Sequence, residues 1–271
     1  MKFAKVILAA LLLTACGASL RKNAITKLRS SSNDERTAAA EFLIDNDGAK
    51  ALPEIADVLK AEFPEIRHTA TWCIARLKDE RAIPYLVKME DDKDQGVRAT
   101  AVEGLGLFGR RGIQALQDLM SPGHKVDVRS RAAWVLGQTG DTGVFDSLVV
   151  MLEKRDAPDE VRAAAARALG CLNDPKPYQP LYSALDDDRN NSTVRCGAAI
   201  GLVSHYMFTS NKGSMDLMSR LITSGPTQEI RSCAAWAHAE LYEPSNLGIY
   251  CNPDGYTSHL QFDRSGGTGF R

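Results

Sequence analysis

The sequence predicts an all-α protein, an α-solenoid of stacked two-helix repeats. The first observation is a set of seven arginines spaced 31, 31, 31, 33, 33 and 36 residues apart: Arg36, Arg67, Arg98, Arg129, Arg162, Arg195 and Arg231. The second is an alanine three positions after each of them. A period of this length indicates an array in which each small unit contacts its neighbours.

An apolar stripe around each arginine predicts the first helix of every repeat. If the arginine is position zero, positions −1 and +7 are apolar in six of the seven repeats, and Glu35 and His238 are the exceptions. Positions −1, +3 and +7 share one face of an α-helix, and the alanine lets a second helix approach closely. We expect N-caps just ahead of four of these helices, at Asp34, Asp127, Asp159 and Thr193.

A second helix is predicted in each repeat from apolar residues at i, i+3 and i+7, as in Leu52, Ile55 and Leu59. Proline is harmless in the first turn of a helix, which suits Pro53 and Pro84. Glycine often ends a helix, so we expect Gly137 and Gly170 to form the turns after their first helices.

The segment DEVRAAAARALGCLND (Asp159–Asp174) resembles the HEAT repeat, in the bacterial form often called PBS-lyase-like. The segment VDVRSRAAWVLGQTGD (Val126–Asp141) is nearly as similar, and the resemblance covers residues 33 to about 241. It implies HEAT-like repeats whose second helices line the concave face of the solenoid.

The start of the chain predicts export and lipid attachment. Lys2 and Lys5 precede an apolar run that is too short to span a bilayer. The sequence Leu13-Thr14-Ala15-Cys16 then resembles the lipobox of bacterial lipoproteins, in which the cysteine carries acyl chains. The resemblance implies a lipid on Cys16, and Gly17 after it implies the outer membrane, facing the periplasm. An ordinary secretory signal with a chance cysteine is the alternative.

Four parts are therefore expected along the chain. They are a lipoprotein signal peptide (1–15), a lipidated cysteine with a linker and capping helix (16–32), an array of six full repeats plus a terminal half repeat (33–242) and an irregular, partly disordered tail (243–271). The helix expected over residues 18–30 is basic. That charge suits either capping of the first repeat or contact with anionic lipid beside the anchor.

The repeat arginines themselves need partners, because a cation near a helix N-terminus is unfavourable to the helix dipole. Aspartate stands twelve residues after the arginine in three repeats, at Asp79, Asp141 and Asp174. We predict an arginine–aspartate ladder between neighbouring repeats. The alternative is an arginine row that binds anions.

The sequence offers no candidate catalytic residues, cofactor or metal site. A formal net charge of −1 argues against nucleic-acid binding. No G-x-S-x-G, phosphate-loop or H-E-x-x-H motif is present, nor the His-Glu dipeptides by which some HEAT-repeat oxygenases bind iron. Asp92, Asp94 and Glu103 imitate part of a calcium loop, but Val97 occupies the position that requires glycine. The run Asp186-Asp187-Asp188 is interpreted as a solvated loop.

Five cysteines follow Cys16, and their pairing is open: Cys73, Cys171, Cys196, Cys233 and Cys251. Three of them fall within first helices and are expected to be small buried residues: Cys73, Cys196 and Cys233. Cys251 is a candidate to join the tail to the last repeats, with Cys233 as its partner. An odd number leaves at least one thiol unpaired.

These observations predict a lipid-anchored periplasmic scaffold, not an enzyme, that binds a protein or peptide on its concave face. The expected contact residues are outward positions of the second helices, together with two tryptophans at position +5: Glu54, Asp57, Tyr85, Lys88, Gln114, Gln117, Asp118, Asp146, Glu153, Gln179, Tyr182, Trp72 and Trp134. All three tryptophans, including Trp236, share that position and also suit packing between repeats. The alternatives are a bilin-lyase-like enzyme or subunit and a structural component of the envelope.

Overall fold

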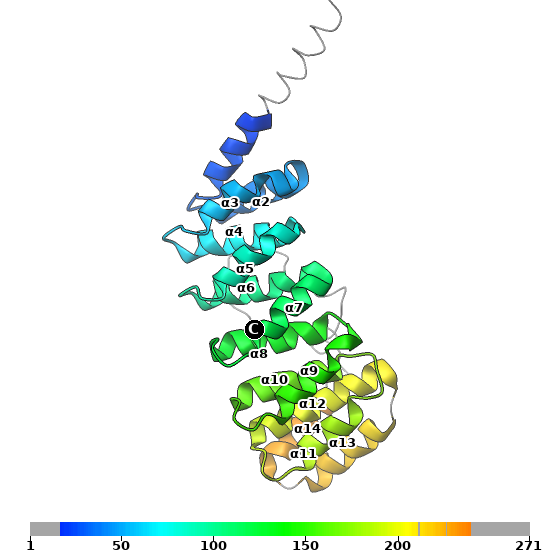
Figure 1. The fold of residues 1–271 in the computed structure, drawn as a ribbon. Coiled ribbons are helices and arrows are strands. Elements are labelled where there is room, and N and C mark those ends of the chain that lie inside the picture. Colours follow the sequence, from blue (N-terminus) through cyan, green and yellow to red (C-terminus); the bar gives the residue numbers. More distant parts are fainter. Residues whose placement is uncertain (1–16, 211, 226, 240–271) are drawn as a thin grey trace, which may run out of the picture. The chain divides into compact units, whose positions relative to one another are not determined.

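A computed structural model of the chain describes residues 17–210, 212–225 and 227–239. The described part is all-α, with helices and turns and no strand (Figure 1). The chain divides into two compact units, whose described parts are residues 17–107 and 108–239. The predicted fold class, an all-α solenoid of helical repeats, is confirmed.

The first unit begins with a helix over residues 17–27. First helices α2, α4 and α6 alternate with the shorter second helices α3 and α5, and 3₁₀ turns η1 and η2 precede the second helices. The bounds are α2 (Asn33–Asn46), η1 (Gly48–Ala51), α3 (Leu52–Val58), α4 (Pro64–Arg76), η2 (Glu80–Ala82), α5 (Ile83–Met89) and α6 (Gln95–Leu105). Helix α2 contacts α4, and α4 contacts α6, so successive first helices form one layer.

The second unit continues the alternation from α7 to α14, after the 3₁₀ turn η3 (Gly106–Phe108). The bounds are α7 (Gly109–Leu119), α8 (Val126–Gln138), η4 (Thr142–Val144), α9 (Phe145–Glu153), α10 (Asp159–Gly170), α11 (Tyr178–Asp186), α12 (Ser192–Thr209), α13 (Lys212–Ser224) and α14 (Gln228–Ala239). First helices α8, α10, α12 and α14 contact one another in that order. Second helices α9, α11 and α13 pack against them.

The predicted apolar stripe forms the core of both units. The alanine at position +3 is buried in every repeat, with at most 4% of its surface exposed. Every apolar residue at positions −1 and +7 is buried too, and Pro53 and Pro84 lie in the first turns of α3 and α5 as expected. Full burial of a leucine or isoleucine side chain contributes about 1.5–3 kcal/mol, so this stripe is a main source of stability.

Gly137 and Gly170 do not form the predicted turns. Gly137 lies inside α8, and Gly170 is the last residue of α10. A Cβ atom on Gly137 would approach the Ala168 backbone to 2.6 Å, and one on Gly170 would lie 2.1 Å from the Gly201 carbonyl oxygen. These glycines therefore allow first helices to touch, and the turn after α8 uses Gly140 instead, with φ at +67°.

The predicted N-caps were wrong by one or more positions. Asp34, Asp127 and Asp159 lie within the first turns of their helices, and Thr193 is inside α12. The side chains that accept a cap hydrogen bond ahead of first helices belong to Ser32, Asp94, Asn191 and Thr227. A cap residue has extended backbone geometry, whereas a carboxylate inside the first turn interacts with the helix dipole.

The N-terminal helix contacts the first repeat through its basic side chains. Arg21 pairs with Asp47 and Glu54 at 3.5 and 3.6 Å, and Arg29, just after the helix, pairs with Asp57 at 3.0 Å. Ala24 and Leu28 are buried. Two of the four basic residues are thus used within the protein, which favours capping over lipid contact.

Replacement of Gly170 by alanine tests the close packing of α10 on α12. The added Cβ would overlap the Gly201 carbonyl, so the helices must separate, and we expect a loss of about 1–3 kcal/mol in the free energy of unfolding. Urea denaturation followed by circular dichroism measures the change. Gly123→Ala is the matched control, because a Cβ there meets nothing within 4 Å. Equal stability of the two variants would contradict this packing.

Candidate functional site

All seven repeat arginines fold back onto a carbonyl oxygen earlier in the chain. Four donate from Nη1 to loop carbonyls five or six residues earlier: Arg36, Arg67, Arg98 and Arg231. The other three donate from Nε to the end of the preceding second helix, with Arg129 on Met120 at 3.0 Å, Arg162 on Leu152 at 2.9 Å and Arg195 on Leu185 at 2.8 Å. The last carbonyls of a helix lack partners inside it and carry partial negative charge. Each arginine therefore supplies a hydrogen bond to a backbone carbonyl of the segment that precedes it in the array.

Two of these arginines also reach forward to the loop before the next first helix. Arg67 makes two hydrogen bonds of 2.7 Å to the carboxylate of Asp92, and both side chains are 6% exposed. Arg162 donates to the side-chain oxygen of Asn190 at 2.6 Å. Burial favours a higher pKa for Asp92, but the hydrogen bonds from Arg67 and from the Asp94 backbone hold that pKa below its usual value. At these two junctions the arginine thus joins one inter-repeat loop to the next, as one rung of an arginine ladder.

The predicted acidic partners of the ladder were wrong. Asp79, Asp141 and Asp174 accept a hydrogen bond from the backbone N–H two residues later, at 2.9, 2.8 and 2.9 Å. This local turn, which aspartate favours, lies at the start of the segment that leads into the second helix. Asp79 also binds the Arg81 guanidinium, which lowers the pKa of Asp79 to about 2. The forward partners of the arginines are instead the loop residues Asp92, for Arg67, and Asn190, for Arg162.

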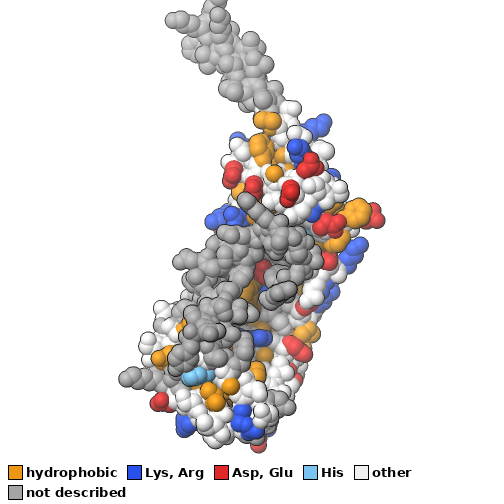
Figure 2. All heavy atoms as spheres, turned by 180° about the vertical axis from the view of Figure 1, so that it is seen from behind, with side chains coloured by type: hydrophobic (Ala, Val, Ile, Leu, Met, Phe, Trp, Pro, Cys, Tyr) orange, Lys and Arg blue, Asp and Glu red, His pale blue; other side chains and the backbone are white. Residues whose placement is uncertain are grey.

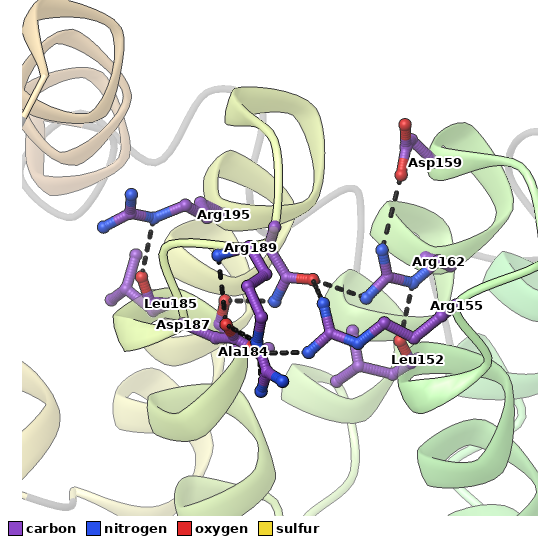
Figure 3. A network of polar contacts seen from close by, with 10 residues as sticks. Leu152, Arg155, Asp159, Arg162, Ala184, Leu185, Asp187, Arg189 and Arg195 are labelled. Atoms are coloured by element: carbon purple, nitrogen blue, oxygen red, sulfur yellow. Dashed lines mark hydrogen bonds and ion pairs between the residues drawn. The ribbon is translucent and has the colours of Figure 1, made fainter.

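The loops after α9 and α11 are joined by a polar network (Figure 3). Asp187 accepts hydrogen bonds from Arg189 and Arg155, and these guanidinium groups hold the pKa of Asp187 well below its usual value. Asn190 accepts from Arg155 and Arg162 and donates to the Ala184 carbonyl at 2.8 Å. The expected solvated loop at Asp186–Asp188 is therefore a structural junction at Asp187.

The expected contact residues of the first unit lie on α3 and α5. Glu54, Asp57, Tyr85 and Lys88 are all exposed. Glu54 and Asp57 form the ion pairs with Arg21 and Arg29, and Asp57 also pairs with Lys60 at 3.0 Å. These two acids thus already have a role in the fold, which leaves Tyr85 and Lys88 as the stronger candidates there.

In the second unit the expected contact residues lie on α7, α9 and α11. Five of them are exposed, and two are half-buried: Gln114, Asp118, Asp146, Glu153 and Gln179 are exposed, and Gln117 and Tyr182 are half-buried. Gln117 donates to the Ser147 hydroxyl at 3.1 Å, which links α7 to α9, and α9 contacts α11. The structure therefore brings these residues together on one layer of adjacent second helices.

The tryptophans are packing residues more than surface anchors. Trp72 is only 6% exposed, and the Arg76 guanidinium lies 5.4 Å from its ring centroid. Trp134 is half-buried, with Arg131 5.3 Å from its ring centroid. The expectation of Trp72 as a contact residue is wrong, because it offers almost no surface. The side chain of Trp236 lies outside the described residues.

Among the described cysteines, Cys196 of α12 and Cys233 of α14 form a disulfide. The proposed pairing of Cys233 with Cys251 is therefore wrong, and Cys16 and Cys251 lie outside the described residues. The sequence signal that could have revealed this pair is the position of each cysteine in its repeat. The two cysteines stand one and two residues after their arginines on neighbouring first helices. Cys171 is also disulfide-bonded, and Cys73 is a buried free thiol whose pKa burial raises to about 12.

The described residues contain no group of three His, Cys, Asp or Glu side chains arranged to hold a metal ion. His205 is fully buried in α12, with Nε2 3.0 Å from the Asp174 carbonyl oxygen, and burial lowers its pKa. None of the helices described has the length and apolar character needed to cross a membrane.

Comparison with known proteins places this architecture in a family. A family model for HEAT repeats matches residues 8–106, 87–159, 113–203 and 145–239. The chain belongs to the HEAT-repeat family. It is 26% identical over 170 residues to an uncharacterized phycocyanin operon protein Z of Pseudanabaena tenuis, a match that covers 60% of this chain and 81% of that protein.

The chain is similar at low identity to two solved structures. Human deoxyhypusine hydroxylase is 18% identical, with 86% of this chain and 99% of that chain covered and a TM-score of 0.39. The complex of CpcE and CpcF of phycocyanin lyase from Nostoc sp. PCC7120 is 19% identical, with 81% and 94% covered and a TM-score of 0.42.

The arginine ladder predicts a large difference between two aspartate variants. Asp92→Asn leaves the buried Arg67 charge without its counterion, so we expect a loss of about 3–5 kcal/mol in unfolding free energy at pH 7. Asp79→Asn breaks a pair whose arginine is exposed, and is expected to cost far less, because solvent screens that pair. Chemical denaturation of both variants measures the contrast.

The Arg67–Asp92 pair also predicts how the difference in stability between wild type and Asp92→Asn depends on pH. The pKa of Asp92 is depressed in the folded protein, so its contribution is complete above the unfolded value of about 3.9 and is lost as pH falls through the folded value. The gap between wild type and Asp92→Asn should therefore narrow in strong acid. A constant gap from pH 7 to pH 3 would contradict the pairing.

Proposed function

We propose that this HEAT-repeat protein is a lipid-anchored periplasmic scaffold that binds a protein or peptide partner on its second-helix layer. The observation that carries the proposal is the exposed surface of α7, α9 and α11, where Gln114, Asp118, Asp146, Glu153 and Gln179 face solvent. Repeat arrays commonly use such extended surfaces for binding. No catalytic residue is assigned.

The disulfide chemistry supports a location outside the reducing cytosol. Disulfides persist in the periplasm and are rare in the cytosol. The bond between Cys196 and Cys233 joins α14, the final helix of the described residues, to its neighbour α12. Together with the lipobox-like sequence that ends at Cys16, it favours export, and Gly17 favours the outer membrane.

The anchor is tested by Cys16→Ser. Loss of the acylated thiol should move the protein from the detergent phase to the aqueous phase, because the acyl chains provide the membrane affinity. Triton X-114 partitioning of cell extracts measures the distribution, with Cys73→Ser as the control for loss of a cysteine. Unchanged partitioning of Cys16→Ser would contradict lipid attachment.

The binding surface is tested by photocrosslinking in cells. A photoreactive residue at Lys88, Asp118 or Glu153 should give one dominant protein adduct by mass spectrometry. The control position is Glu160, an exposed residue in the first turn of α10, which belongs to the other helix layer. Adducts that are absent, or equally abundant from Glu160, would contradict partner binding by the second helices and favour a purely structural role in the envelope.

A bilin-lyase-like role is the second candidate. The name of the Pseudanabaena relative links that protein to a phycocyanin operon, and its identity to this chain is 26%. Incubation of the purified protein with a bilin separates the two functions. A coloured complex would favour the lyase-like role, and a colourless protein with a crosslinked partner would favour the scaffold.

A further inference from the structure

The outward faces of α9 and α11 form a continuous strip, which we call the α9–α11 ridge. On α9 it consists of Asp146, Val150 and Glu153, and on α11 of Gln179, Tyr182 and Asp186. In each helix these residues follow one another at three- or four-residue spacing, so they share one face. The helices contact each other, and the network around Asp187 joins the loops that follow them.

The charge of the ridge has a single sign. Asp146, Glu153 and Asp186 are exposed, and the described residues provide no ion pair to any of them. Neither Phe145–Glu153 nor Tyr178–Asp186 contains a lysine or arginine. Three like charges without compensation create a local negative potential that attracts cations.

Three basic residues around the ridge are engaged elsewhere. Arg155 and Arg189 both bind Asp187, as Figure 3 shows. The Lys176 ammonium lies 5.8 Å from the centroid of the Phe145 ring, a cation–π arrangement. Lys154, which follows Glu153, is half-buried at the end of α9. The fold thus uses Arg155, Arg189 and Lys176, and none of these four cations forms an ion pair with a ridge acid.

An apolar side chain lies between the acids. Val150 is 64% exposed, one turn from Asp146 on one side and from Glu153 on the other. Tyr182 of α11 is half-buried and adds aromatic surface, with its ring 6.2 Å from that of Tyr178. An apolar centre with a charged rim is the usual anatomy of a protein interface. By contrast, acidic and basic side chains are interspersed over the described surface in the view of Figure 2.

We propose that the α9–α11 ridge binds a segment of the partner protein in which Lys or Arg residues flank an apolar side chain. The cations pair with Asp146, Glu153 and Asp186, and the apolar side chain covers Val150. This inference rests on the proposed scaffold function and specifies the chemistry of its partner. Complementary charge would raise the association rate and set the orientation of the bound segment.

A pair of synthetic peptides tests the charge preference on the full chain. The first is a fluorescent helical peptide of about 14 residues with Leu on one face and Lys on its borders, a layout suited to the ridge. The second replaces every Lys by Glu. Fluorescence anisotropy should show binding of the Lys peptide alone, weakened as salt screens the exposed charges.

Matched variants locate the binding site. Asp146→Asn with Glu153→Gln removes two ridge charges and should weaken binding of the Lys peptide by about tenfold, which corresponds to about 1.4 kcal/mol. Glu160→Gln removes an exposed charge from α10 and should leave the affinity unchanged. Circular dichroism checks that each variant is folded. Equal binding of both peptides, or equal affinity of the double variant and wild type, would overturn the inference.

Photocrosslinking from Val150 separates this inference from the proposed function. A dominant adduct whose crosslinked peptide carries Lys or Arg on both sides of an apolar residue supports both. A dominant adduct on a partner segment without such residues keeps the proposed function but overturns the basic-segment inference. A dominant adduct on the tail of this chain replaces the partner and also overturns the basic-segment inference. If no adduct forms from Val150, Lys88, Asp118 or Glu153, both proposals fail.

Discussion

The hydrogen bond from a buried arginine to a carbonyl of the preceding segment is the interaction on which the array depends. Five of the seven repeat arginines are at most 8% exposed, so each charge needs acceptors within the protein. Carbonyls at the end of the preceding second helix provide them for Arg129, Arg162 and Arg195, and loop carbonyls provide them for Arg36 and Arg67. For Arg129, Arg162 and Arg195, a position that looks unfavourable in its own helix is favourable because it lies at the C-terminal end of another helix. This explains why the arginine recurs where a single-helix argument would exclude it.

The arginines fix the loops, and small residues fix the distance between first helices. Gly170 faces the Gly201 backbone, and Gly197 faces the Ala163 backbone, so α10 and α12 touch without side chains between them. Contact this close does not tolerate a larger residue, because an added methyl group must displace backbone atoms. The first-helix layer is therefore specified by packing, whereas the outward faces of the second helices carry no such constraint and are open to functional selection.

The sequence predicted the repeats, the helix pairs and the core because periodicity is a local property. Burial of Ala132 and Leu136 follows from spacing alone. The sequence misassigned features that depend on which side chains meet in space. The spacing in the sequence pointed to Asp79, twelve residues after Arg67, whereas the geometry of the folded loop brings Asp92 to Arg67. The predictions that Trp72 is a contact residue and that Cys233 pairs with Cys251 failed for the same reason. Both the burial of a side chain and the pairing of a cysteine depend on neighbouring elements.

The expected contact surface was predicted as one list of exposed residues, but the structure separates it by chemistry. The acids Glu54 and Asp57 of the first unit are neutralised by Arg21 of the N-terminal helix and by Arg29 just after it. The acids of α9 and α11 have no such counterions among the described residues, although Arg155 and Arg189 lie in the adjoining loops and bind Asp187 instead. Retained exposed charge costs little stability at a surface, so it persists without a structural reason. Its clustering around an exposed valine is what makes the second unit the better place to look for a partner.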